Sequence, residues 1–145
     1  MKLALSSAVA ADTDRVFEAL VDPAILQRCI PGCESLIETG PDVYAATLKV
    51  GVAALKGSYS GKAAVTNKVP PHSLTLAFEG KGGPGFVRGS AAVVLTPDSG
   101  VTRIACDADV QVGGLIAAVG SRLVDAAARK LASDFFDRLA RELAA

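Results

Sequence analysis

Three glycines in the stretch EGKGGPGF give this 145-residue chain its best match to a known chemical motif. Gly80, Gly82 and Gly85 have the spacing G-x-G-x-x-G, with which many proteins bind the pyrophosphate of a dinucleotide. Such a site needs a helix directly after the glycines, because the helix N-terminus binds the phosphates. Phe86 and Val87 instead begin another segment with β-type alternation. We therefore interpret the glycines as the turn of a β-hairpin, where the missing β-carbon permits positive φ angles.

Few side chains of the kinds that catalyse reactions are present. His72, the single histidine, follows two prolines in an expected loop, so we expect neither a Ser-His-Asp triad nor a usual zinc site. Asp107 and Asp109 lie on the polar side of an expected strand and are interpreted as solvated charges. Tyr44 and Tyr59 are expected to point inward, but no base is placed beside them. The sequence therefore favours a protein that is not an enzyme and uses no metal or cofactor.

Charge and cysteine usage argue against further classes of protein. The 15 Lys and Arg residues balance the 15 Asp and Glu residues, whereas nucleic-acid-binding domains usually have a basic excess. The three cysteines include no Cys-x-x-Cys pair, which indicates free thiols in a reducing compartment. The N-terminal apolar run leads directly into a capped helix and does not resemble a signal peptide. The apolar stretch 113–120 is shorter than the ~20 residues that span a bilayer. We therefore expect a cytoplasmic protein.

Hydropathy periodicity predicts one α+β domain over residues 1–145. An alternating strand (2–10) precedes two short helices, which begin at Asp12 and at Asp22-Pro23. Turn residues then separate six more β segments: 34–39, 43–55, 58–67, 73–79, 87–96 and 101–112. Short connections make neighbouring strands antiparallel. We predict a seven-stranded curved sheet with one face covered by a long amphipathic helix over residues 115–143.

The residues that face this helix define the candidate ligand site. Small residues on neighbouring strands, among them Ala46, Gly61 and Ala63, favour an apolar cavity between the sheet and the helix. A fully packed core is the alternative. The side chains that we expect to line the cavity are Tyr44, Leu48, Tyr59, Leu76, Phe78, Ala91, Val93, Ile104, Cys106, Val119 and Leu123.

Four lysines gather on neighbouring expected strands: Lys49, Lys56, Lys62 and Lys68. If they share the outer face of the sheet, they form a positive surface that fits an acidic partner or an anionic membrane. An ordinary solvated surface would explain the same residues, and this alternative stays open.

Several motifs spread over the whole chain match one protein family. The more specific ones are IPGCESL at 30–36, VGGL at 112–115 and GSRL at 120–123; YAA at 44–46, LKG at 55–57 and YSG at 59–61 support them. With these motifs the chain resembles the CoxG-like family, which is named after a component of carbon monoxide dehydrogenase and lies in the helix-grip superfamily of START and Bet v 1-like domains. The resemblance implies a β-α-α-β6-α fold with a hydrophobic cavity and no agreed catalytic residues.

The same resemblance implies an accessory role for a molybdenum hydroxylase of the CO dehydrogenase type. Family members are associated with attaching that enzyme to the membrane and with handling a quinone. We therefore expect a protein that binds a quinone or lipid in its cavity, in the cytoplasm or peripherally at the inner face of the cell membrane. Many members continue into an apolar tail, whereas this sequence stops at Ala145, so we expect a ligand carrier rather than a direct anchor.

Two other functions stay open. The protein could be an assembly module that holds no ligand and docks on the hydroxylase through its sheet or its lysines. It could also be an enzyme, since helix-grip relatives include cyclases and hydrolases, and Tyr44 and Tyr59 would then be the candidate polar groups.

Overall fold

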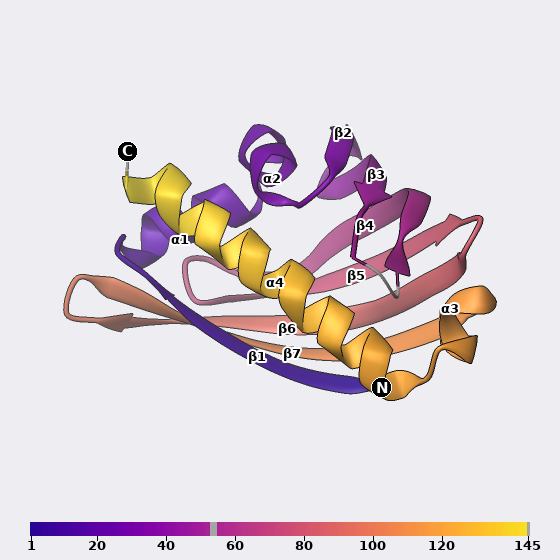
Figure 1. Ribbon diagram of the computed structural model, residues 1–145. Coiled ribbons are helices and arrows are strands. Elements are labelled where there is room, and N and C mark those ends of the chain that lie inside the picture. Colours follow the sequence, from indigo (N-terminus) through magenta and orange to yellow (C-terminus); the bar gives the residue numbers. More distant parts are fainter. Residues whose placement is uncertain (53–54, 145) are drawn as a thin grey trace.

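Seven antiparallel strands form one sheet in the order β1-β7-β6-β5-β4-β3-β2. Figure 1 shows this computed structural model, with α4 lying diagonally across one face of the sheet and β1 running alongside it. The structure describes residues 1–52 and 55–144, so the end of the expected strand 43–55 lies partly outside the described residues. The predicted curved sheet with a long C-terminal helix is confirmed.

The elements are β1 (Lys2–Val9), α1 (Thr13–Leu20), α2 (Pro23–Cys29), β2 (Cys33–Gly40), β3 (Val43–Val50), β4 (Gly57–Val69), β5 (Ser73–Gly82), β6 (Gly85–Asp98), β7 (Val101–Gly113), α3 (Leu115–Ala118) and α4 (Ser121–Ala144).

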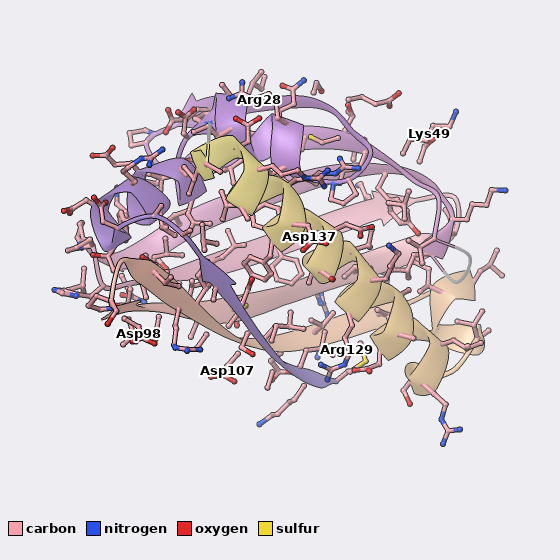
Figure 2. The ribbon with its side chains drawn as sticks, turned by 60° about the vertical axis from the view of Figure 1, so that its left-hand side comes forward. Arg28, Lys49, Asp98, Asp107, Arg129 and Asp137 are labelled. Carbon is pink, nitrogen blue, oxygen red and sulfur yellow. The ribbon has the colours of Figure 1, made fainter. Side chains whose placement is uncertain are left out.

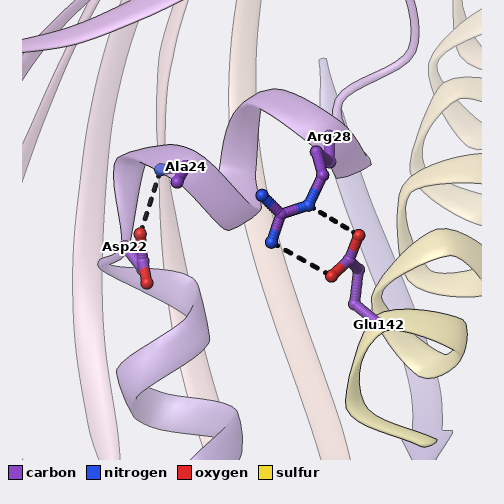
Figure 3. Close-up of polar contacts among 4 residues, drawn as sticks. All are labelled: Asp22, Ala24, Arg28 and Glu142. Atoms are coloured by element: carbon purple, nitrogen blue, oxygen red, sulfur yellow. Dashed lines mark hydrogen bonds and ion pairs between the residues drawn. The ribbon is translucent and has the colours of Figure 1, made fainter. Parts of the chain in front are cut away.

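The two short helices begin where their capping residues predict. The Asp12 carboxylate accepts a hydrogen bond from the Arg15 backbone N–H at 2.9 Å, and Asp22 accepts one from Ala24, also at 2.9 Å (Figure 3). Each bond satisfies a backbone donor that has no partner inside its helix. Pro23 follows Asp22 at the first helical position, where its missing N–H costs nothing.

The glycine run connects β5 and β6 as a hairpin, as predicted. Gly82 pairs with Gly85 across a turn formed by Gly83 and Pro84. Gly85 has a φ of +137°, and a β-carbon there would collide with the carbonyl oxygen of Gly113. Glycine is therefore required by backbone geometry at this position.

The predicted long C-terminal helix is interrupted at Gly120. Its φ of +94° cannot continue an α-helix, so the one-turn helix α3 precedes α4, which begins at Ser121. The side chains of Val119 and Leu123 are 41% and 55% exposed. Both were expected to line the cavity under the long helix, but they are exposed instead. Val124 is the first α4 side chain that packs inward, against Ile116 of α3.

The apolar core consists of two clusters at opposite ends of α4. The larger cluster joins α1, α2 and the C-terminal end of α4, and its members Val16, Cys29 and Leu139 have 0% exposure. The smaller cluster packs Val124 and Ala127 against residues near the other end of the sheet. Fully burying a side chain such as Leu139 contributes about 1.5–3 kcal/mol.

Polar contacts fix the ends of the long helix. The Arg28 guanidinium of α2 donates to both Glu142 oxygens, at 2.7 and 3.1 Å (Figure 3). Towards the other end of α4, Arg129 donates to the Ala4 carbonyl oxygen of β1 at 3.2 Å and lies beside that strand in Figure 2. These contacts hold α4 against β1 and α2. Among the described residues, no helix is long and apolar enough to cross a bilayer.

Candidate functional site

The centre of the inner sheet face, which is the face under α4, is lined mostly by small residues. Strand pairing places Ala46, Gly61 and Gly80 next to one another in one row across β3, β4 and β5. The adjacent row contains Ala63, Phe78 and Gly89. A β-carbon added at Gly80 would meet nothing nearer than the Ser60 carbonyl oxygen at 3.8 Å. There is therefore unfilled space beside Gly80 on this face.

The residues predicted to line a cavity fall into three groups. Tyr44, Ala91 and Ile104 are 4%, 5% and 1% exposed and belong to the packed core. Val119 and Leu123 are exposed, as described above. The remaining six lie on the inner face and keep intermediate exposure: Leu48, Tyr59, Leu76, Phe78, Val93 and Cys106.

These six residues lie between and beside the two core clusters. Leu76 and Val93 pack on the larger cluster, and Leu48 and Tyr59 pack on the smaller one. Phe78 and Cys106 belong to neither cluster. Leu131 and Phe135, from the middle of α4, are also only partly buried. The middle of the inner face is therefore less tightly packed than either end.

The two tyrosine hydroxyls of the inner face are hydrogen-bonded to backbone carbonyl groups. The Tyr44 hydroxyl donates to the Val21 carbonyl oxygen at 3.0 Å, and the Tyr59 hydroxyl donates to that of Leu55 at 2.6 Å. Burial raises the pKa of both phenols and of the Cys106 thiol, so all three stay protonated at neutral pH. These neutral groups and the apolar side chains around them make a surface that can hold an apolar molecule.

The other side chains considered for chemistry are dispersed. His72 is exposed in the turn between β4 and β5, and Asp107 and Asp109 are exposed on β7. Figure 2 shows Asp107 on the side of the sheet away from α4. In the part of the chain that the structure describes, no three His, Cys, Asp or Glu residues are grouped so that they could hold a metal ion.

A second hollow, of about 650 Å³, opens on the opposite, outer face of the sheet. Along β2 to β6, the side chains that line this hollow alternate with the side chains that point inward. Lys62 and Glu79 therefore line the hollow, while their neighbours Ala63 and Phe78 face α4. Its size is within the range of ligand and peptide sites. The outward residues lining this outer groove are Ser35, Ile37, Ala45, Thr47, Ser60, Lys62, Glu79, Lys81, Phe86 and Arg88; Ala46, Gly61, Gly80 and Val87, whose side chains or α-hydrogens belong to the inner rows, also border its floor.

The four predicted surface lysines do not form one group. Lys49 and Lys62 are exposed on β3 and β4, and Figure 2 shows Lys49 pointing away from the body of the protein. Lys68 instead forms an ion pair with Asp42 at 2.8 Å. Sequence reasoning missed Lys81 and Arg88, which the pairing of β4, β5 and β6 places near Lys62. The available signal was the period-two spacing of Glu79 and Lys81 before the glycine turn, with Arg88 on the strand that follows it.

Comparisons with known proteins agree with this architecture. The chain is similar to a conserved protein from Geobacillus kaustophilus of known crystal structure. The two sequences are 38% identical, and the structures superpose with a TM-score of 0.96 over 99% of this chain and 95% of that chain. A START superfamily protein from Mycobacterium smegmatis is similar in fold, with 14% identity and a TM-score of 0.76 over 98% of this chain and 96% of that chain. No curated protein matches the chain. The family model for CoxG, described as one of the subunits of carbon monoxide dehydrogenase, matches residues 6–144, so the chain belongs to the CoxG family.

Proposed function

We propose that the protein is a non-catalytic accessory protein of a CO dehydrogenase-type molybdenum hydroxylase, and that it binds an apolar small molecule, a quinone or a lipid. The family description supports the partnership. The observation that carries ligand binding is the loosely packed centre of the inner face, where small residues are paired across the strands and free space lies beside Gly80. Transfer of apolar ligand surface out of water would drive binding at about 25 cal/mol per Å².

The geometry suggests how the ligand would lie. Phe78 and Cys106 would contact it from the sheet, because both lie on the inner face outside the two core clusters. Leu131 and Phe135 would contact it from the middle of α4, where both are only partly buried. Quinones and lipids reside in membranes, so the protein would work in the cytoplasm and contact the inner face of the membrane transiently to exchange its ligand.

Mass spectrometry of the protein purified from its own host tests ligand binding, with solvent extraction to identify any bound molecule. We expect the wild-type protein to carry one quinone or lipid per chain. Gly80→Leu should fill the space on the inner face and remove that molecule while the protein stays folded. Gly83→Leu is the matched control, because a β-carbon in that turn would meet nothing within 4 Å. Ligand retained by folded Gly80→Leu, or absent from the wild-type protein, would count against this site.

A further inference from the structure

The outer groove lies on a face of the sheet that the helices leave uncovered. Figure 1 shows α1, α2 and α4 together on the opposite face. Two rows of paired residues form the groove, one from Ser35 to Phe86 and the other from Ile37 to Arg88. Each row crosses five strands, β2 to β6. At a strand spacing of about 4.8 Å, the groove is roughly 19 Å long.

Each end of the groove has one large exposed apolar side chain beside a polar one. Ile37 at the β2 end is 61% exposed, and Phe86 at the β6 end is 41% exposed. Ser35, on β2 with Ile37, and Thr47 on the neighbouring β3 share a hydrogen bond of 2.8 Å between their hydroxyls. Large exposed apolar side chains at both ends of a concave surface are typical of a site that binds another molecule.

The charge of the groove is positive, although the whole chain is balanced. Lys62, Lys81 and Arg88 line it together with a single carboxylate, Glu79. Among the described residues, no carboxylate oxygen lies within 4.0 Å of the nitrogen atoms of these three cations. Arg88 is instead held over the Phe86 ring, 5.5 Å from its centre, and its Nε donates to Gln111 at 3.0 Å. The cations therefore remain available for an acidic group from outside.

We propose that the outer groove is the surface on which the partner enzyme docks, through an acidic segment that also places apolar side chains against Ile37 and Phe86. This inference rests on the partnership in the proposed function. The backbone groups of β3 to β6 are paired on both sides, so a segment lying across these strands binds through side chains and not by adding a strand. A second copy of this chain fits poorly, because two positive grooves would repel each other. A flat membrane surface cannot fill a concave groove.

The test measures binding of the full-length protein to the purified CO dehydrogenase-type hydroxylase of the same organism, by biolayer interferometry at low and at moderate salt. Lys62→Glu/Lys81→Glu should weaken binding at least about tenfold, and Ile37→Asp should also weaken it. Lys2→Glu/Lys130→Glu changes the net charge equally but lies outside the groove. This control should bind within about twofold of the wild-type protein.

The alternative outcomes separate the two proposals. If both charge reversals weaken binding equally, only long-range charge matters and the groove is not the dock. If neither does, the groove proposal fails while the partnership stands. If the wild-type protein does not bind the hydroxylase, the partnership and the dock both fall, whereas ligand binding is judged by its own experiment. A dimer in analytical ultracentrifugation that Ile37→Asp disrupts would show that a second copy covers the groove, and would overturn the proposal.

Discussion

The two faces of the sheet are built from the same strands but have opposite chemistry. The inner face under α4 carries small and apolar residues such as Gly61, Ala63 and Phe78, whereas their neighbours Lys62 and Glu79 point outward. Alternation with a period of two produces both faces from one stretch of sequence. The middle of the inner face is apolar and has free space, while the outer face combines charged residues with an exposed apolar side chain at each end of the groove. One sheet can therefore hold an apolar ligand on one side and dock a protein on the other.

The largest expected difference between the faces is in stability. Leu139 of α4 is fully buried against the inner face, so Leu139→Ala should lower the free energy of unfolding by about 2–5 kcal/mol. Ile37 is 61% exposed on the outer face, and Ile37→Ala should change the free energy of unfolding by about 0.5 kcal/mol or less. Urea unfolding followed by circular dichroism measures both. Similar losses for the two variants would show that the outer face is also covered in solution.

Two glycines of the inner face should respond in opposite ways to the same substitution. A β-carbon at Gly89 would collide with the Asp109 backbone carbonyl oxygen, which strand pairing holds in place, so Gly89→Ala should destabilise by roughly 1–3 kcal/mol. Gly80→Ala enters free space and should stabilise by about 0.5–1 kcal/mol, because alanine loses less backbone entropy on folding. Comparing the thermal unfolding of Gly89→Ala and Gly80→Ala shows which of the two positions on the inner face has space for a methyl group. Destabilisation by Gly80→Ala would mean that the space is filled.

Much of this fold follows from local sequence signals. Asp12 and Asp22 start helices, and the Gly83-Pro84 turn sets a hairpin, because each acts through its immediate neighbours. Gly120 was missed because a single glycine inside an apolar stretch does not reveal its φ, and the rotation of α4 depends on that angle.

The candidate sites were harder to predict for a related reason. Tyr44 and Ile104 have the inward alternation expected of cavity residues, but packing by α1, α2 and the end of α4 buries them in the core. The outer groove was not predicted, because it depends on the register that brings Lys62, Glu79 and Arg88 into one row. Register and curvature arise from pairing between strands, which alternation within one strand does not specify.

The cysteines provide chemical probes of the inner face. Burial raises the pKa of Cys106, on the inner face, and of Cys33, at the sheet edge. Both should therefore react with iodoacetamide more slowly than free cysteine, and their reaction rates should increase with pH only at a higher pH than that of free cysteine. Fully buried Cys29 should be the slowest of the three. A bound quinone should protect Cys106 and leave Cys33 unchanged, as measured by peptide-resolved mass spectrometry. Equal protection of both thiols would indicate a general change in structure rather than a ligand on the inner face.

The smallest expected effect concerns the ion pair that ties α2 to the end of α4. Arg28 holds the pKa of Glu142 below its ordinary value, chiefly by donating hydrogen bonds to the carboxylate. A carboxyl group with a lower pKa in the folded protein stabilises above its unfolded pKa, and this contribution disappears as the pH falls through the folded value. Glu142→Gln should therefore lower the melting temperature slightly at neutral pH, and the difference from the wild-type protein should vanish once the pH lies below the lowered pKa of Glu142 in the folded protein. The effect is small because the pair is solvated and screened by salt, so added salt should also reduce it. A difference that persists at low pH would show that Glu142 acts by packing against α2 and not by its charge.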